Sequence, residues 1–233
     1  STAKDMNFRE CIIPKANSAE GALINNIDII GVSSLQEAIL HLTQDSPCPP
    51  YILNPQDYTY EASKDIDFSD IKGQENVKRA LEVAAAGKHN ILLIGPPGTG
   101  KTMLANRLPT ILPPLSYNES IELTKIYSIC SELDKSYQII TSRPFRSPHH
   151  TTTPVALIGG GRLPKPGEVS LAHHGVLFLD ELLEFNKTAL EILRQPLEDH
   201  KVTISRINAT FTFPANFMLV ASTNPCPCGF YPD

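Results

Sequence analysis

The sequence predicts an α/β fold in which helices cover both faces of a parallel sheet, with a small α/β segment in front of it. Three short apolar runs, at residues 90–94, 176–179 and 217–221, have the length of buried strands. Helix-forming stretches separate these runs, and a glycine-rich turn directly follows the first of them. Buried strands that alternate with helices are typical of parallel sheets.

Length and composition suit one large globular domain, or one domain with a smaller piece attached. The 233 residues are 41% apolar, and their net charge of −5 argues against a uniformly nucleic-acid-coated surface but leaves room for a local basic patch. Five cysteines, an odd number, argue against a disulfide scaffold and favour a reducing cytoplasm. No apolar run approaches the roughly 20 residues that a membrane span needs, and we find no signal peptide. We therefore expect a cytoplasmic protein with no membrane partner.

Residues 1–42 predict a small α/β unit. Its strands are expected at residues 8–13 and 27–32, with Pro14 ending the first, and its helices at residues 18–23 and from a serine cap, Ser33 or Ser34, to Leu42. Residues 43–66 are expected to form a linker, because clustered prolines disfavour both helices and central strands.

Residues 67–233 predict the main unit. Besides the three strands, its expected elements are helices at residues 76–86, 103–108, 116–131 and 186–200 and a hairpin at residues 202–213. Gly87 should stop the first helix and Asn186 should cap the last. The hairpin should turn near Ile207 and Asn208.

A phosphate-binding loop follows the first strand and opens a helix. Its residues are Gly95, Pro96, Pro97, Gly98, Thr99, Gly100, Lys101 and Thr102. Glycines let the backbone approach phosphate closely, Lys101 can reach the β- and γ-phosphates, and the Thr102 hydroxyl can bind Mg²⁺. Because strand, loop and helix occur in the required order, a chance glycine turn is a poor alternative. The loop predicts binding of ATP or ADP with Mg²⁺.

Polar residues follow the other two apolar runs. Asp180 and Glu181 end the run at residues 176–179, where an aspartate can hold Mg²⁺ and a glutamate can act as the general base towards water. Asn224 follows the run at residues 217–221 and can hold the attacking water or sense the γ-phosphate. An ordinary buried strand end or a turn asparagine would look alike in isolation; their order behind a phosphate loop favours a catalytic set of Lys101, Glu181 and Asn224.

Two further residues are candidate nucleotide contacts. The segment Asp70-Ile71-Lys72-Gly73-Gln74 precedes a helix and can wrap the adenine, mainly through its backbone and Ile71, although a plain turn would look similar. Met103 directly follows the phosphate loop.

With these motifs in this order, the chain resembles an AAA+ ATPase, and further stretches narrow the resemblance. They are residues 143–151, 159–161, 166–168, 171–175, 193–198 and 224–229. These stretches are similar to the Mg-chelatase-like branch and, within it, to the ComM/YifB family. The resemblance covers residues 67–233 as a large AAA+ subdomain without its helical lid. Residues 1–42 resemble the end of a Lon-protease-like domain.

The resemblance implies an ATP-hydrolysing motor in the bacterial cytoplasm, assembled as a hexameric ring with ATP between subunits. It also implies two pore-facing insertions, one between Pro114 and Gly161 and one in the hairpin. Members of this family are linked to DNA branch migration or helicase-like processing during transformation or recombination. A metal-chelatase motor subunit and a nucleotide-dependent scaffold without motor activity remain alternatives. Because the chain starts at Ser1 without Met and stops before the lid and arginine finger that the family carries, we expect a fragment with weak or no hydrolysis by itself.

Cysteines and histidines leave two readings open. Cys226 and Cys228 could contribute to a split zinc site in a longer protein, or serve as turn thiols, since zinc sites more often use a C-x₂₋₄-C spacing. The pairs His149-His150 and His173-His174 are expected to pack in loops or contact a neighbouring subunit rather than bind metal, because adjacent strand residues face opposite ways and no carboxylate spacing accompanies them.

Basic residues near the proposed insertions are candidates for DNA phosphate contacts, with ordinary solvated charge as the default alternative. They are Arg143, Arg146, Arg162, Lys165, Lys201 and Arg206. Arg194 and Arg206 could instead act on a neighbouring subunit's nucleotide.

Overall fold

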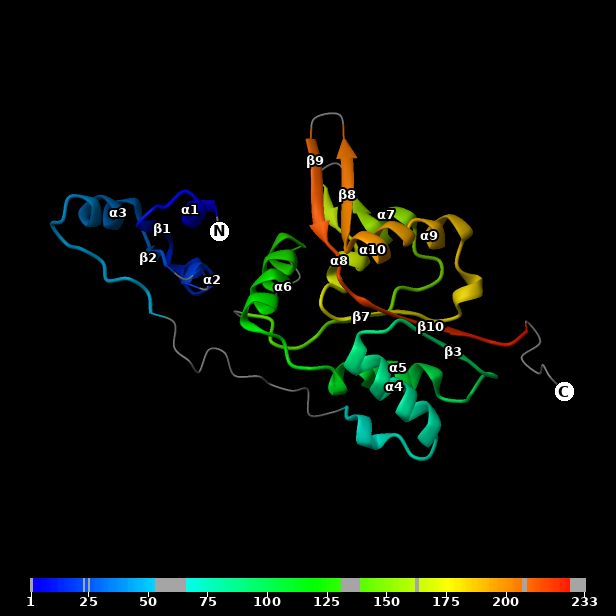
Figure 1. The fold of residues 1–233 in the computed structure, drawn as a ribbon. Coiled ribbons are helices and arrows are strands. Elements are labelled where there is room, and N and C mark those ends of the chain that lie inside the picture. The colour runs from blue at the N-terminus through cyan, green and yellow to red at the C-terminus, as the bar shows by residue number, and fades with distance from the viewer. Residues whose placement is uncertain are drawn as a thin grey trace. The chain divides into compact units, whose positions relative to one another are not determined.

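The computed structural model describes residues 2–22, 24, 26–52, 66–130, 139–161, 164–206 and 209–226, with the backbone alone at residues 206 and 209. The chain divides into two compact units (Figure 1). The smaller comprises Ser1–Thr59 with Asp134–Ile139, and the larger comprises Tyr60–Leu133 and Ile140–Asp233.

The smaller unit is built on two parallel strands. Its elements are α1 (Thr2–Asp5), β1 (Glu10–Pro14), η1 (Lys15–Asn17), α2 (Ser18–Ala22), β2 (Asp28–Val32) and α3 (Leu35–Leu42). The register pairs Glu10 with Asp28 and Pro14 with Val32, so the first strand includes Pro14 instead of ending before it. Ser34 caps α3, as one of the two predicted caps, by accepting a hydrogen bond from the Glu37 amide at 3.2 Å.

The larger unit contains the predicted parallel sheet. Its helical elements are η3 (Phe68–Asp70), α4 (Glu75–Gly87), α5 (Lys101–Arg107), η4 (Leu108–Ile111), α6 (Tyr117–Cys130), α7 (Pro154–Ile158), α8 (Glu168–Leu171), η5 (Leu182–Glu184), α9 (Lys187–Glu191) and α10 (Arg194–Asp199). Its strands are β3 (Ile91–Ile94), β4 (Phe145–Arg146), β5 (Gly159–Gly160), β6 (Lys165–Pro166), β7 (Val176–Leu179), β8 (Lys201–Arg206), β9 (Ala209–Pro214) and β10 (Met218–Thr223). Among the described helices, none has the length and apolar character required to cross a membrane.

The strand order of the main sheet determines where the functional motifs meet. Four strands run parallel in the order β3-β10-β7-β4. β10 therefore lies between the strand before the phosphate loop and the strand before Asp180, with Thr223 opposite Ile94 and Ala221 opposite Leu179. Because all the strands point the same way, their carboxyl ends, and the loops that follow them, share one edge of the sheet.

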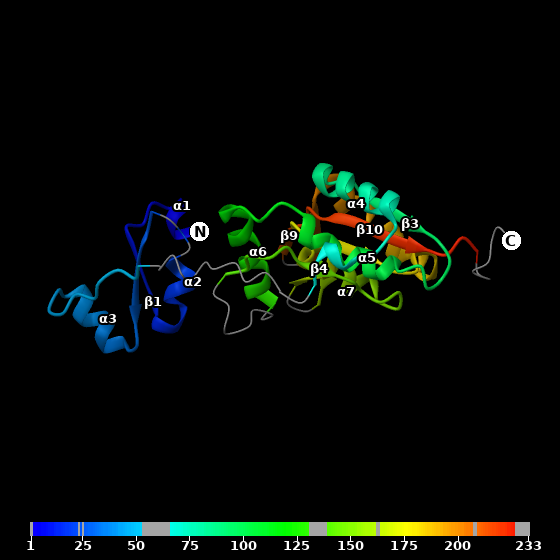
Figure 2. The ribbon, with the colours of Figure 1, turned by 90° about the horizontal axis from the view of Figure 1, so that it is seen from below.

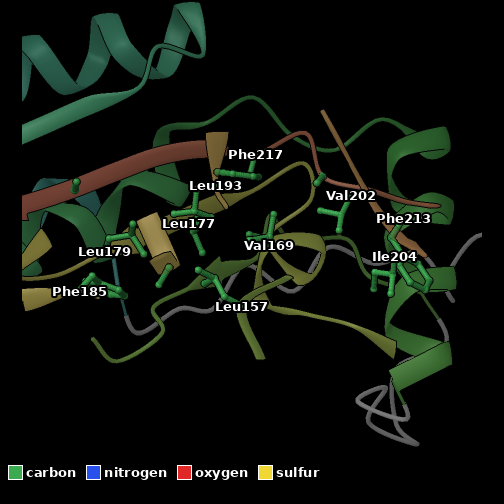
Figure 3. Close-up of a cluster of buried hydrophobic side chains, with 14 residues drawn as sticks. Leu157, Val169, Leu177, Leu179, Phe185, Leu193, Val202, Ile204, Phe213 and Phe217 are labelled. Atoms are coloured by element: carbon green, nitrogen blue, oxygen red, sulfur yellow. The ribbon is translucent and has the colours of Figure 1, made fainter. Parts of the chain in front are cut away.

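Side-chain alternation along β7 divides the core between the two faces of the sheet. Val176 and Phe178 pack with α4 and α5, and Figure 2 shows α4 running along this side of the sheet near β3 and β10. Leu177 and Leu179 face the opposite cluster, where Figure 3 shows them among side chains from the helices and the hairpin. All four are fully buried, which explains why the strand is a continuous apolar run instead of an alternating one.

The hairpin β8–β9 packs one face into the core and projects beyond the sheet (Figure 1). Val202 pairs with Phe213 on the buried face, and Thr203 pairs with Thr212 on the exposed face. This confirms the predicted hairpin, whereas its turn at residues 207–208 lies outside the described residues.

Three predicted details of the helices and strands in the larger unit were wrong. The helix expected at residues 186–200 is two short helices, α9 and α10, because Pro196 has no N–H for the Ile192 carbonyl and can only lie in the first turn of a new helix. The strand at residues 91–94 is an edge strand, so Leu92 and Ile94 are 48% and 64% exposed instead of buried. The helix α4 includes Gly87, and Lys88 takes the left-handed cap conformation, at φ 52°.

Candidate functional site

The phosphate loop lies at the carboxyl edge of the sheet, between β3 and α5. Gly98 and Gly100 have φ angles of 80° and 82°, and apart from each glycine and its two chain neighbours no heavy atom lies within 4 Å of the position that a Cβ would occupy. Positive φ favours glycine at both positions, and the open space beside them leaves the backbone approachable by a ligand. The Thr99 hydroxyl donates to the Pro96 carbonyl at 2.9 Å and closes the turn. Such a cradle fits a phosphate group.

Lys101 connects this loop to the end of β10. Its Nζ donates to the carbonyls of Gly95 at 2.7 Å and Pro96 at 3.0 Å and to Asn224 Oδ1 at 3.1 Å. The Gly95 amide in turn donates to the Thr223 carbonyl at 3.3 Å. A cation is thus held against the loop, within contact of the predicted sensor amide.

Oxygen groups from three segments meet beside the loop. The Thr102 hydroxyl donates to Asp180 Oδ2 at 2.9 Å, and the Ser222 hydroxyl donates to Asp180 Oδ1. Hydroxyl and carboxylate oxygens are the ligands that Mg²⁺ prefers, so Thr102 and Asp180 have the chemistry to hold this ion. Ser222 also accepts from the Glu181 amide at 3.2 Å. Sequence reasoning missed Ser222, although its spacing of two from Asn224 was a usable signal.

The chain changes direction at Glu181. It follows the buried strand β7, has φ 54° and ψ 53° in the left-handed region, and is exposed at the start of η5. An exposed carboxylate beside a Thr–Asp pair can accept a proton from water.

The two further predicted nucleotide contacts differ in exposure. Ile71 is 5% exposed and packs in the core beneath α4 and α5, whereas Met103 is 40% exposed on α5. Gln74 ties this segment to the phosphate loop, because its Nε2 donates to the Thr99 carbonyl at 2.9 Å. Contacts of Ile71 and Met103 with a nucleotide stay a prediction.

The cysteine pair follows Asn224. Cys226 is half-buried two residues beyond it, while Cys228 lies outside the described residues. A zinc role for Cys226 and Cys228 therefore stays a prediction.

A second polar cluster lies at the opposite end of β7, and it corrects the sequence-based view of His173 and His174. His174 has φ 55°, so the two rings lie side by side with centroids 3.8 Å apart instead of facing opposite ways. Carboxylates from α6 accompany them: Glu122 Oε2 lies 3.2 Å from His173 Nε2 and 2.9 Å from His174 Nε2, and Glu119 Oε1 lies 3.4 Å from His174 Nδ1.

The hydrogen bonds of His173 assign its proton. The Asn216 amide donates to His173 Nδ1 at 3.0 Å, so Nδ1 is an acceptor and Nε2 carries the proton that faces Glu122. This Nε2 is consequently not free to bind a metal ion, although Glu122, His173 and His174 form a group with metal-ligand spacing. Burial, helped by the neighbouring His174, lowers the pKa of His173 to about 4. Burial raises the pKa of Glu122, but the hydrogen bonds from His174 and His173 outweigh it and leave that pKa lowered. The cluster fastens α6 to the start of β7.

Two of the arginines that were proposed to contact DNA form hydrogen bonds and an ion pair within the protein. Arg143 donates to the carbonyls of His174 at 2.6 Å and Pro114 at 3.3 Å, and its side chain is 7% exposed. Arg146 pairs with both oxygens of Glu168, at 2.7 and 2.8 Å.

The other candidate cations are exposed or lie outside the described residues. Lys165 and Lys201 are exposed, and Arg194 pairs with Glu198 at 3.0 Å. Arg162 and the side chain of Arg206 lie outside the described residues.

Known proteins match the part of the chain that contains these motifs. The family model described as magnesium chelatase, subunit ChlI, matches residues 67–233. Competence protein ComM of Haemophilus influenzae is 45% identical over 231 residues, which cover 98% of this chain and 45% of that protein. The protein YifB of Escherichia coli is 46% identical over 225 residues, 96% of this chain and 43% of that protein. The chain thus spans less than half the length of these curated relatives.

A solved structure supports the fold. A chain from the complex between subunits BchI and BchD of magnesium chelatase aligns with a TM-score of 0.55 and 24% identity, over 72% of this chain and 57% of that chain. At this identity the likeness concerns the arrangement of the sheet and helices alone.

Proposed function

Because the chain belongs to the magnesium chelatase ChlI family, whose model matches residues 67–233, we propose that it binds ATP and ADP with Mg²⁺ and hydrolyses ATP as part of a ring-forming AAA+ motor. One observation supports this proposal most strongly. The phosphate loop, Asp180 and Asn224 follow three different strands, yet Thr102 contacts Asp180 and Lys101 contacts Asn224. This convergence is what a phosphate-and-magnesium site requires.

Each residue of the site has a role in this proposal. The loop Gly95–Gly100 and Lys101 bind the phosphates, with backbone amides and one cation facing the negative charge. Thr102 and Asp180 would hold Mg²⁺, which would supply positive charge against the β- and γ-phosphates. Glu181 accepts the proton of the attacking water, and Asn224 orients that water or senses the γ-phosphate.

A ring completes the site in this proposal. Neighbouring subunits supply the arginine that reaches the nucleotide, and a helical lid closes over it, as expected for the family. The fold neighbour comes from a complex between two kinds of magnesium chelatase subunit, which supports assembly as the working state.

We propose DNA as the substrate of the motor. The relative ComM is named a competence protein. The hairpin β8–β9 carries no acidic residue, and its exposed face offers Lys201, Thr203 and Thr212, which can contact phosphate oxygens. The exposed Lys165 on β6 offers a second cation.

A metal-chelatase motor subunit is the second candidate, since the matching family is itself named after magnesium chelatase. It shares the ATPase core and differs in what the motor acts on. Metallation of a porphyrin, assayed with partner subunits, distinguishes it from a DNA motor.

ATP hydrolysis by the whole protein, with and without single-stranded or branched DNA, tests the proposal. We expect DNA to stimulate turnover, and we expect Lys201→Ala to weaken this stimulation. Lys187→Ala on α9, whose side chain is 89% exposed, is the matched control. An ATP turnover rate that no form of DNA changes contradicts the proposal that DNA is the substrate. Absence of ATP hydrolysis contradicts the proposed motor function.

A further inference from the structure

Ser222 is a buried serine that contacts both members of the acidic pair. It lies in β10 with 0% of its surface exposed. Its hydroxyl donates to Asp180 Oδ1 and accepts from the Glu181 amide at 3.2 Å. A serine hydroxyl has one proton to donate and can accept at its lone pairs, so one group satisfies both neighbours.

The first contact fixes the orientation of the Asp180 carboxylate. Ser222 occupies Oδ1, and the Thr102 hydroxyl occupies Oδ2 at 2.9 Å. With Oδ1 held from inside the sheet, Oδ2 faces the phosphate loop. Without the Ser222 hydroxyl, nothing described on the β10 side holds Oδ1, and the carboxylate can rotate about its side-chain bonds.

The second contact holds Glu181 in an unusual backbone conformation. Glu181 has φ 54° and ψ 53°, a left-handed region that is sterically disfavoured for residues with a Cβ. The hydrogen bond from its amide to Ser222 satisfies that donor in this conformation. The direction in which Glu181 leaves the sheet therefore depends on the same hydroxyl.

The position of Ser222 also connects it with Asn224. The two residues are two apart, and side chains two apart along a strand point to the same side. Asn224 contacts Lys101 at 3.1 Å, while Ser222 contacts the acidic pair. The end of β10 thus touches the phosphate loop and the acidic pair with neighbouring side chains.

We propose that Ser222 is a positioning residue for the magnesium-dependent step, which aims Asp180 at the ion and holds Glu181 in its left-handed conformation. This inference rests on the function proposed above. The Ser222 side chain forms no hydrogen bond with the loop or with Lys101 among the described residues. Replacement of Ser222 should therefore change the Mg²⁺ dependence of binding without changing phosphate binding itself.

Binding of ADP to this chain, titrated in EDTA and at increasing Mg²⁺, tests the inference. For Ser222→Ala we expect the affinity in EDTA to stay within about twofold of wild type, while the half-saturating Mg²⁺ concentration rises about tenfold. Ser222→Thr keeps the hydroxyl and should restore most of the Mg²⁺ response. Ser170→Ala is the control, because Ser170 in α8 is equally buried but its hydroxyl has no hydrogen-bond partner among the described residues.

Hydrolysis by the whole protein gives a second readout. At saturating Mg²⁺, Ser222→Ala should lower kcat about tenfold with KM for ATP nearly unchanged. An unaltered Mg²⁺ response in Ser222→Ala overturns the inference alone. A loss of ADP affinity in EDTA together with a lower melting temperature of Ser222→Ala also overturns the inference, because this combination indicates a structural role only. If the wild-type chain binds no ADP, or binds it without any Mg²⁺ dependence, the proposed function itself fails and the inference with it.

Discussion

The Thr102 hydroxyl donates a hydrogen bond of 2.9 Å to Asp180 Oδ2, although the two residues are 78 positions apart in the chain. β10 brings them together, because it lies between β3 and β7 and pairs with both in parallel. The phosphate loop and the acidic pair therefore form one site at one sheet edge.

Replacement of Glu181 by Gln should separate hydrolysis from binding. The amide keeps the shape of the side chain but cannot accept the water proton, so turnover by the whole protein should fall about 10²–10⁴-fold while ATP stays bound. Nucleotide retention and phosphate release measure the two effects. Glu184→Gln, on the neighbouring η5, is the matched control. Unchanged turnover and unchanged retention in Glu181→Gln would rule out this role.

The Arg146–Glu168 pair should stabilise the larger unit more than a surface pair does. Both side chains are about one quarter exposed and share two hydrogen bonds, so Arg146→Ala should lower the free energy of unfolding by about 1–2 kcal/mol. Arg194→Ala breaks a pair whose side chains are 82% and 64% exposed, and should cost no more than about 0.5 kcal/mol. Urea unfolding compares them, and equal losses contradict the assignment of Arg146 to the fold.

His173 should make stability fall in mild acid. Its folded pKa, about 4, lies below the unfolded value near 6.5, so between these pH values the unfolded chain takes up a proton that the folded chain excludes. The free energy of unfolding should decrease by up to about 3 kcal/mol as the pH falls from 6.5 to 4, with no contribution from His173 above this window. Glu122, whose pKa is lowered, adds a loss as the pH falls through its folded pKa.

Urea unfolding across this pH range checks the slope. His173→Gln should flatten it, whereas the exposed His149→Gln should leave it unchanged. A slope that persists in His173→Gln assigns the acid sensitivity to other groups.

Core packing around β7 predicts a matched pair of leucine truncations. Leu177 is fully buried between the sheet and the helices and hairpin of Figure 3, so Leu177→Ala should cost about 2–5 kcal/mol. Leu183, which is 72% exposed, should cost well under about 1 kcal/mol when truncated in the same way. Thermal unfolding distinguishes the two variants, and similar melting temperatures would contradict the assigned core.

Local sequence patterns were sufficient for the main strands and for the site motifs. The apolar run Val176–Leu179 predicted a strand buried on both faces, and the sequence placed Asp180 and Asn224 directly after apolar runs that the structure shows as neighbouring strands. The predicted helix at residues 186–200 missed the break before Arg194, although Pro196 cannot continue a preceding helix and marks it.

Contacts between distant segments were not readable from local pattern. The left-handed His174 places both histidine rings towards Glu119 and Glu122, about fifty residues away. The two-residue strand β4 is too short to give a periodic signal, and only its pairing with β7 defines it. Likewise, the burial of Arg143 depends on the Pro114 and His174 carbonyls, so sequence analysis could not distinguish it from a surface cation.

The most direct test of the proposed nucleotide site is calorimetric titration of this chain with ADP and Mg²⁺. Lys101 is held at the phosphate loop by Gly95, Pro96 and Asn224, so Lys101→Ala should weaken binding at least about 100-fold, by roughly 3 kcal/mol. Lys187→Ala, at an exposed position on α9, should bind as wild type does. An affinity for ADP that is the same in Lys101→Ala as in wild type would contradict the assignment of the phosphate loop.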